Sequence, residues 1–230
     1  MSVFLELGIE LTGTVEKATG LIVNVSDIDK KVRNFAVPVF AEGIRAAYRE
    51  ARHISHFELT SMLKSVWGKL TDMFGQARLN ELSLKLNPFR ILSIDNPEGV
   101  MVYFSEKFEF AASHKLWNEQ FSKEKNIEIF GKCANPAGHG HNYIVEITVN
   151  YPIDKELRTG DFEKIVNQEL IKSVDHKNLN EDVPEFQQLT PTVENITVLA
   201  WNKLVGRFGS ANLYCVTVWE TDKTNSSYYG

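Results

Sequence analysis

A cysteine and three histidines are the residues of this chain best suited to chemistry. Cys133 stands six residues before His139, and His139 and His141 form a His-x-His pair in a run with the composition of a β-strand. Side chains two apart along a strand point to one face, so both imidazoles can bind the same metal ion. His114 lies in a second strand-like run upstream. Three imidazoles without a fourth protein ligand are typical of a catalytic zinc site, and a nearby thiol is a candidate base or nucleophile.

The His-x-His pair also has a simpler explanation. Most such pairs are solvated or structural, and a short motif taken alone is a hypothesis. The addition of His114, the spacing from Cys133 and the Gly-His-Gly-His context of residues 138–141 favour a metal site.

Further polar residues downstream are weaker candidates. Asp175 and His176 are adjacent, and the carboxylate would favour the protonated imidazole, although an Asp-His-Lys run also suits a solvated helix end. Thr192 is a candidate helix N-cap and Glu194 would complement the helix dipole, which suffices to explain both. Their predicted part in substrate binding is therefore secondary.

Glu220 is a more specific candidate for substrate binding. It ends the apolar strand-like run 214–219, which predicts a carboxylate at the rim of a sheet. A carboxylate there can accept two parallel hydrogen bonds from the edge of a guanidine-like ring. The alternative is an ordinary exposed strand end.

Composition limits the class of protein. The chain has 230 residues, 43% hydrophobic and 24% charged, as in ordinary globular proteins. A net charge of −5 argues against a nucleic-acid partner. Two cysteines are too few for a disulfide framework, and Cys215, in a β-rich run, is expected to pack as a small hydrophobe. No apolar run is long enough to cross a bilayer and the first residues do not resemble a signal peptide, so we expect a cytoplasmic protein.

The sequence contains an internal repeat. Residues 67–75 and 201–209 share Trp, Lys, Leu, Phe and Gly in register, 134 residues apart. Residues 9–12 resemble residues 145–148 at about the same spacing. The pattern predicts two copies of one unit, with the order strand, helix, helix, strand, strand. The repeated glycines, Gly75 and Gly209, are predicted to cap helices.

The two copies differ where chemistry would occur. The second copy begins with an extra segment, from about 104 to 143, that holds all the metal candidates. At the repeat spacing Asp175, His176 and Glu220 correspond to Ala41, Glu42 and Leu86. We therefore predict a structural unit at 1–103, whose histidines at 53 and 56 lie on the surface, and a complete unit at 104–230. A hairpin turn over 95–99 joins them.

These residues resemble a known family. From about 108 to 229 the chain is similar to 6-pyruvoyl-tetrahydropterin synthase and 6-carboxy-tetrahydropterin synthase. The matching motifs are Ala112-Ser-His-Lys-Leu116, Phe130-Gly-Lys-Cys133, Asn135-Pro136, Gly138-His-Gly-His-Asn-Tyr143, Asp175-His-Lys-Asn-Leu179, Asp182-Val-Pro184, Thr192-Val-Glu-Asn195 and Trp219-Glu-Thr-Asp222. The resemblance implies an α+β chain of two tandem tunnelling-fold units, each an antiparallel sheet with two helices on one face, assembling into β-barrels.

The resemblance also implies roles for the site residues. His114, His139 and His141 would bind zinc, which suits three imidazoles. Cys133 would abstract a proton, with Asp175 and His176 as relay partners. Substrate would be held by Glu220, with Thr192 and Glu194 nearby. The implied enzyme is a carbon–oxygen lyase acting on phosphates, which converts 7,8-dihydroneopterin triphosphate to 6-pyruvoyl-tetrahydropterin. Four lysines, Lys115, Lys123, Lys125 and Lys132, surround the metal segment and are candidates to attract the triphosphate or are solvated.

Two other functions remain open. One is the 6-carboxy-tetrahydropterin synthase reaction of queuosine synthesis, although five residues separate Cys133 from His139 here and three are expected there. The other is a zinc- and pterin-binding protein without catalysis. Retention of Cys133, Asp175, His176 and Glu220 together argues against it.

The duplication implies an assembly. Members of this family have one unit per chain, three units close a barrel and two barrels stack. A chain of two units reaches six units as a homotrimer, which we expect here.

Overall fold

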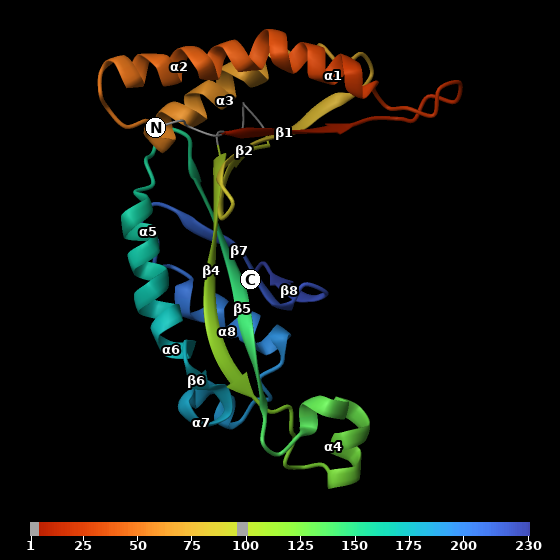
Figure 1. Cartoon of the computed structure of the whole chain (residues 1–230), viewed down its shortest axis with the longest axis vertical. Helices are drawn as coiled ribbons and strands as arrows, with labels where there is room; N and C mark the ends of the chain where they lie inside the picture. The colour runs from red at the N-terminus through yellow and green to blue at the C-terminus, as the bar shows by residue number, and fades with distance from the viewer. Residues whose placement is uncertain (1–4, 96–100) are drawn as a thin grey trace. The chain divides into compact units, whose positions relative to one another are not determined.

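The structure, a computed structural model, describes residues 5–95 and 101–230 and divides into two compact units (Figure 1). Unit 1 contains residues 1–105 and 150–157, and unit 2 contains residues 106–149 and 158–230. The turn predicted over 95–99 falls almost wholly outside the described residues. Within the described part of the chain, no helix is long and apolar enough to cross a membrane.

Unit 1 is a small antiparallel sheet with helices. Its elements are β1 (Glu6–Thr12), α1 (Val25–Lys31), the π-helical turn η1 (Val32–Ala36), α2 (Val37–Arg49), α3 (His56–Leu70), β2 (Arg78–Asn87) and β3 (Arg90–Ile94). Strands β1, β2 and β3 pair antiparallel in that order. Leu82 and Leu84 alternate with polar residues and are buried, as are Leu63 and Leu70 of α3. This alternation places the core between α3 and the sheet.

A capping box starts α3. The Ser55 hydroxyl accepts a hydrogen bond from the Glu58 backbone, and the Glu58 carboxylate accepts one from the Ser55 backbone. These bonds satisfy two helix-end N–H groups that would otherwise lack partners. The helix begins at His56, whose ring packs 4.9 Å from that of Phe104. His56 is therefore half-buried, because an apolar strand residue packs against its ring, whereas His53 is exposed as expected.

Unit 2 contains the longer strands. Its sheet runs β4 (Met101–His114), β5 (His139–Pro152), β7 (Asn212–Thr221) and β8 (Thr224–Tyr228), with short β6 (Lys177–Asn178) parallel to β4. The helical segments are α4 (Lys123–Phe130), η2 (Gly131–Ala134), α5 (Thr159–Val166), η3 (Asn167–Ile171), α6 (Lys172–Val174), α7 (Leu179–Asp182), η4 (Pro184–Gln187) and α8 (Val193–Leu204). The first residues of β4 and the last of β5 belong to unit 1.

Helices cover one face of the unit 2 sheet (Figure 1). Along β5 the residues Tyr143, Val145, Ile147 and Val149 are fully buried, and the residues between them are not. Helix α8 packs on β7 and β8, and its inward residues Ile196 and Ala200 are buried. The period of two in the strand and the helical spacing in α8 together define this core.

Several element bounds recur at the repeat spacing. Strands β2 and β7 begin and end 134 residues apart, as do β3 and β8. Helices α3 and α8 end 134 residues apart, and a five-residue π-helical turn lies between α1 and α2 in unit 1 and between α5 and α6 in unit 2.

The repeated glycines do not cap helices, contrary to the prediction. Helices α3 and α8 end at Leu70 and Leu204, where the next N–H bonds back to the carbonyl of Trp67 or Trp201. Gly75 and Gly209 lie five residues later and both have φ of 64°. They serve the turn into the following strand, where a residue without Cβ adopts a positive φ without strain.

Candidate active site

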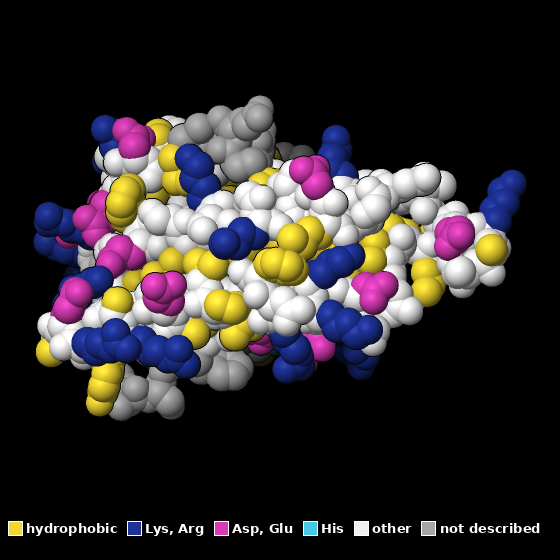
Figure 2. All heavy atoms as spheres, turned by 90° about the horizontal axis from the view of Figure 1, so that it is seen from above, with side chains coloured by type: hydrophobic (Ala, Val, Ile, Leu, Met, Phe, Trp, Pro, Cys, Tyr) yellow, Lys and Arg dark blue, Asp and Glu magenta, His cyan; other side chains and the backbone are white. Residues whose placement is uncertain are grey.

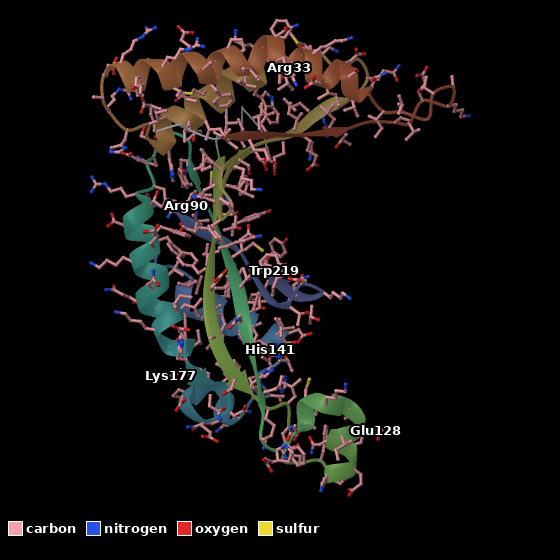
Figure 3. All side chains as sticks on the ribbon, viewed as in Figure 1. Arg33, Arg90, Glu128, His141, Lys177 and Trp219 are labelled. Atoms are coloured by element: carbon pink, nitrogen blue, oxygen red, sulfur yellow. The ribbon has the colours of Figure 1, made fainter. Side chains whose placement is uncertain are left out.

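Two strand ends bring the three predicted metal ligands together. His114 is the last residue of β4, and His139 and His141 are the first and third residues of β5. Each imidazole offers one nitrogen, and these three atoms lie within 4.8 Å of one another. The Nε2 atoms of His114 and His139 are 3.0 Å apart. Figure 3 shows His141 on its strand, with side chains of neighbouring segments around it.

The ring of His114 has a defined orientation. Its side chain is fully buried, and its Nδ1 lies 2.8 Å from the carbonyl oxygen of Pro191. A carbonyl only accepts, so Nδ1 carries the proton and Nε2 presents its lone pair to the other two imidazoles. Burial lowers the pKa of His114, although the Pro191 carbonyl acts in the opposite direction. The neutral ring with a partner on its outer nitrogen is the arrangement that metal-binding histidines adopt.

The donor set fits zinc. His139 Nδ1 and His141 Nε2 are buried nitrogens without a hydrogen-bond partner in the described structure. Burial lowers the pKa of His139, and the neighbouring His141 adds to this effect. Buried polar atoms without partners are costly, and a bound cation would satisfy imidazole lone pairs directed into one space. A set of three imidazoles favours zinc among the common metals and is typical of sites that keep an open coordination position.

Glu220 and Tyr143 border the three imidazoles. Glu220, near the end of β7 as predicted, places Oε1 3.4 Å from His114 Nε2 and 3.8 Å from His141 Nε2. The Tyr143 hydroxyl lies 3.4 Å from both ring nitrogens of His114. Burial raises the pKa of Tyr143, and the Glu220 carboxylate and the Cys133 thiol act in the same direction. The phenol therefore stays protonated at neutral pH and is able to donate a hydrogen bond.

Sequence reasoning missed Tyr143 as a site residue. The signal was present, because Tyr143 follows His139 and His141 at the same two-residue spacing and so lies on the same strand face. Its place in an apolar strand made a core role the simpler explanation.

Cys133 lies in the short helical turn before β5. It belongs to η2 and is half-buried, and its carbonyl accepts a hydrogen bond from Leu116 N at 2.9 Å. The connection before η2 is held by Asn126, a fully buried side chain that bonds to the backbone of Asn118 and Phe121. The Cys133 thiol contributes to the raised pKa of Tyr143, after burial and Glu220.

Asp175 and His176 lie beside β4. Asp175 Oδ1 accepts a hydrogen bond from Ala111 N at 2.9 Å and lies 2.9 Å from His176 Nδ1. The Ala111 bond is the main reason why the pKa of Asp175 is lowered, and His176 adds to it. The His176 side chain is 81% exposed, and its φ of 55° is uncommon for a residue with a side chain.

The predicted relay pair and the predicted base have different surroundings in the described structure. His176 and His141 line the same open groove, of about 460 Å³, but Cys133 does not line it. Among the described residues no hydrogen bond or ion pair joins Asp175 or His176 to Cys133.

The remaining candidates have other contacts. The Thr192 hydroxyl caps α8 by accepting from Asn195 N, and Glu194 is exposed in the first turn of that helix. Lys115 lies over the ring of Trp117 and Lys125 pairs with Glu128. These contacts do not test a part in substrate binding.

Comparison with known proteins gives a consistent result for this region. The sequence model of one protein family, 6-pyruvoyl tetrahydropterin synthase, matches residues 103–230. The 6-pyruvoyl tetrahydrobiopterin synthase of Homo sapiens is 40% identical over 130 residues, which are 55% of this chain and 90% of that protein. The chain belongs to the 6-pyruvoyl tetrahydropterin synthase family. The resemblance inferred from its motifs is confirmed, as is the prediction of a lyase of this type.

Further relatives extend the comparison. The Drosophila melanogaster 6-pyruvoyl tetrahydrobiopterin synthase is 39% identical over 56% of this chain and 80% of that protein. An Aquifex aeolicus 6-carboxy-5,6,7,8-tetrahydropterin synthase is 26% identical over 54% of this chain and 95% of that protein. The solved structure of the Caenorhabditis elegans 6-pyruvoyl tetrahydropterin synthase matches 56% of this chain and 96% of that chain, with a TM-score of 0.53 and 31% identity. The α+β fold, a curled antiparallel sheet with helices, is thus confirmed; the duplication and the barrels remain predictions.

Proposed function

We propose that the chain is a zinc-dependent synthase that converts 7,8-dihydroneopterin triphosphate to 6-pyruvoyl-tetrahydropterin with loss of triphosphate. The observation that carries this proposal is the convergence of three imidazoles with a carboxylate, Glu220 Oε1, 3.4 Å from His114 Nε2. The family to which the chain belongs supports a pterin as substrate.

The residues around the imidazoles suit the steps of this reaction. The Glu220 carboxylate would accept two hydrogen bonds from the amino-pyrimidine edge of the pterin and so orient its side chain toward the histidines. Thr192 and Glu194 would lie at the edge of this substrate site. Zinc held by His114, His139 and His141 would supply Lewis acidity to the side-chain oxygens of the substrate and so acidify the neighbouring C–H bonds.

Proton transfer would fall to Cys133 and Tyr143. A thiolate is a suitable base for a carbon acid, and Cys133 lies in η2, shortly before the strand that carries His139 and His141. The Tyr143 phenol, whose pKa is raised by burial, would donate a hydrogen bond to a substrate oxygen on which negative charge develops. Asp175 and His176 would accept the proton from the thiol and return it.

The direct test is turnover of the zinc-loaded protein with 7,8-dihydroneopterin triphosphate, with products identified by mass spectrometry and triphosphate release measured. We expect 6-pyruvoyl-tetrahydropterin from the wild type and loss of turnover, by about 100-fold or more, in Cys133→Ala. Cys215→Ala is the matched control, because Cys215 is the other free cysteine and is buried in β7. It should keep full activity.

Two other outcomes would contradict the proposal. Release of 6-carboxy-tetrahydropterin with acetaldehyde would assign the chain to the reaction named for the Aquifex relative. Retained zinc and pterin binding without turnover would make the chain a binding protein.

We further propose that Asp175 and His176 complete a site on a neighbouring chain of a homotrimer. The support is the exposed His176 side chain, which has no recorded contact with Cys133 of its own chain in the described structure. If two units per chain replace two single-unit chains, three chains provide the six units of two stacked barrels. Native mass spectrometry that gives a mass other than three chains would contradict the trimer.

A mixing experiment tests the shared site. Cys133→Ala and His176→Ala chains are inactive alone in this scheme. Random mixed trimers would recover about a quarter of the wild-type sites, because each site takes one residue from each of two chains. Absence of recovery, with native mass spectra that show mixed trimers, would place both residues in one chain's site.

A further inference from the structure

Unit 1 contains a cavity that the proposed reaction does not use. Its volume is about 660 Å³, within the range of small-molecule sites. The floor is apolar and comes from both sheet and helices: Leu5, Ile44, Ala47, Leu59 and Leu86. Ala47 and Leu59 are buried, so the cavity reaches the core of unit 1.

The cavity lies at the unit 1 counterpart of the proposed zinc and pterin site. Leu5 precedes His139 by the repeat spacing of 134 residues, and Leu86 precedes Glu220 by the same spacing. Leucine at both positions removes a metal ligand and the carboxylate proposed to hold the pterin. In addition, β1 is the edge strand of the sheet among the described residues, so no counterpart of β4 and His114 lies beside it. Space is therefore left in unit 1 at the positions that correspond to the proposed ligands of unit 2, and the floor of this space is apolar.

The rim of the cavity is cationic. Arg45 and Arg49 stand four residues apart on α2, so their side chains share one face, and both line the cavity. Neither has an ion pair within the described structure, whereas Arg52, which also lines the cavity, is paired with Glu50 and Glu58. Two adjacent guanidinium groups without an acidic partner repel each other, and both are exposed to an incoming anion.

We propose that this cavity binds an amphipathic anion, with an alkyl body against the leucines and a carboxylate or phosphate head group held by Arg45 and Arg49. Bidentate hydrogen bonding from guanidinium suits both head groups. The apolar floor excludes a bare inorganic anion as the preferred ligand, because the cavity would then stay filled with poorly bonded water.

The test measures binding to the full-length, zinc-loaded protein by isothermal titration calorimetry. The probes are decanoate and decyl phosphate, with decanol and inorganic phosphate as the apolar and anionic halves alone. We expect one decanoate or decyl phosphate per chain, bound at least tenfold more tightly than decanol or phosphate. Preference between decanoate and decyl phosphate identifies the head group. Equal binding of decanol, or no binding of either amphiphile, overturns the proposal.

Variants locate the ligand. The double change Arg45→Gln/Arg49→Gln should weaken decanoate binding at least tenfold, while Arg33→Gln, an exposed arginine outside the cavity, should leave it unchanged. Ala47→Leu should prevent binding by filling the floor, with circular dichroism to verify folding. His139→Leu should bind decanoate normally, which separates this cavity from the zinc site. Unchanged affinity in the double variant, or loss of binding in His139→Leu, would contradict the assignment.

Discussion

The two units share a framework but differ in chemistry. Strands β2 and β7, and β3 and β8, occupy the same intervals at a spacing of 134 residues. In unit 2 that framework places three imidazoles and a carboxylate together, whereas unit 1 has leucines at two of the matching positions and no strand to match the one that carries His114. The comparison shows that similar strand bounds occur in both units, while the side chains at the strand ends differ in the groups they offer for metal or substrate binding.

The start of the second helix shows how one unit positions a ligand. Helix α3 begins at His56, and α8 begins at Val193, about one turn later in the repeat. The carbonyl of Phe57 therefore lies inside a helix and accepts a bond from Ser61, whereas the matching carbonyl of Pro191 precedes the helix and accepts the bond from His114. A shorter helix frees a backbone carbonyl to orient a metal ligand.

The largest effect is expected when unit 2 is given the unit 1 residue at a ligand position. His139→Leu should lower the zinc content from about one ion per chain to nearly none and abolish turnover, because two imidazoles cannot replace three. Zinc measured by inductively coupled plasma mass spectrometry checks this. His53→Leu, in unit 1, is the control and should keep its zinc. A zinc content in His139→Leu equal to that of the wild type would rule out the proposed ligand set.

A smaller effect is expected at the substrate carboxylate. Glu220→Leu, which copies Leu86, should retain zinc but raise the KM for 7,8-dihydroneopterin triphosphate about 10- to 100-fold, through loss of charge-assisted hydrogen bonds. Glu194→Gln is the comparison for a second acidic residue. If zinc is lost together with substrate affinity in Glu220→Leu, the carboxylate acts on the metal site instead.

Variants of the two helix caps should distinguish an effect on stability from an effect on zinc binding. Ser55→Ala and Thr192→Ala each remove a capping hydroxyl and should lower the free energy of unfolding by about 1 kcal/mol. Only Thr192→Ala should also weaken zinc binding, by about 10-fold, because it loosens the segment that holds the Pro191 carbonyl against His114. Chemical denaturation and zinc competition measure the two effects. Equal zinc affinity in both variants would show that the cap does not position the carbonyl.

The smallest effect is expected on the pH dependence of the free energy of unfolding, through Glu58 of unit 1. The backbone hydrogen bond from Ser55 is the main cause that lowers the pKa of Glu58 below 4.5, and Arg52 contributes. A carboxyl group with a lowered folded pKa stabilises the protein fully above its unfolded pKa, near 4.5, and less as the pH falls through the folded value. Glu58→Gln should therefore be less stable than the wild type at pH 7, with the difference vanishing in acid. A pH-independent difference in denaturant midpoints would point to lost packing.

The secondary structure and most of the site could be predicted because they depend on local pattern. Alternation along 139–149 indicated a strand and placed His139 and His141 on one face, and the run ending at Glu220 placed a carboxylate at a sheet rim. The repeat spacing of 134 residues agrees with the bounds of β2 and β7 and of β3 and β8. The family followed from motifs spread over 108–229, and the family comparison agrees.

Only the tertiary structure decided which groups meet. The Pro191 carbonyl orients His114 from 77 residues away, and a backbone acceptor has no signature in residue type. The packing of His56 on Phe104 and the raised pKa of Tyr143 depend on burial by distant segments. Asp175 lies against Ala111 because the pairing of β4 with β6 brings it there. Side-chain type and spacing are local properties, whereas hydrogen-bond partners, burial and electrostatic neighbours are set by how the whole chain packs.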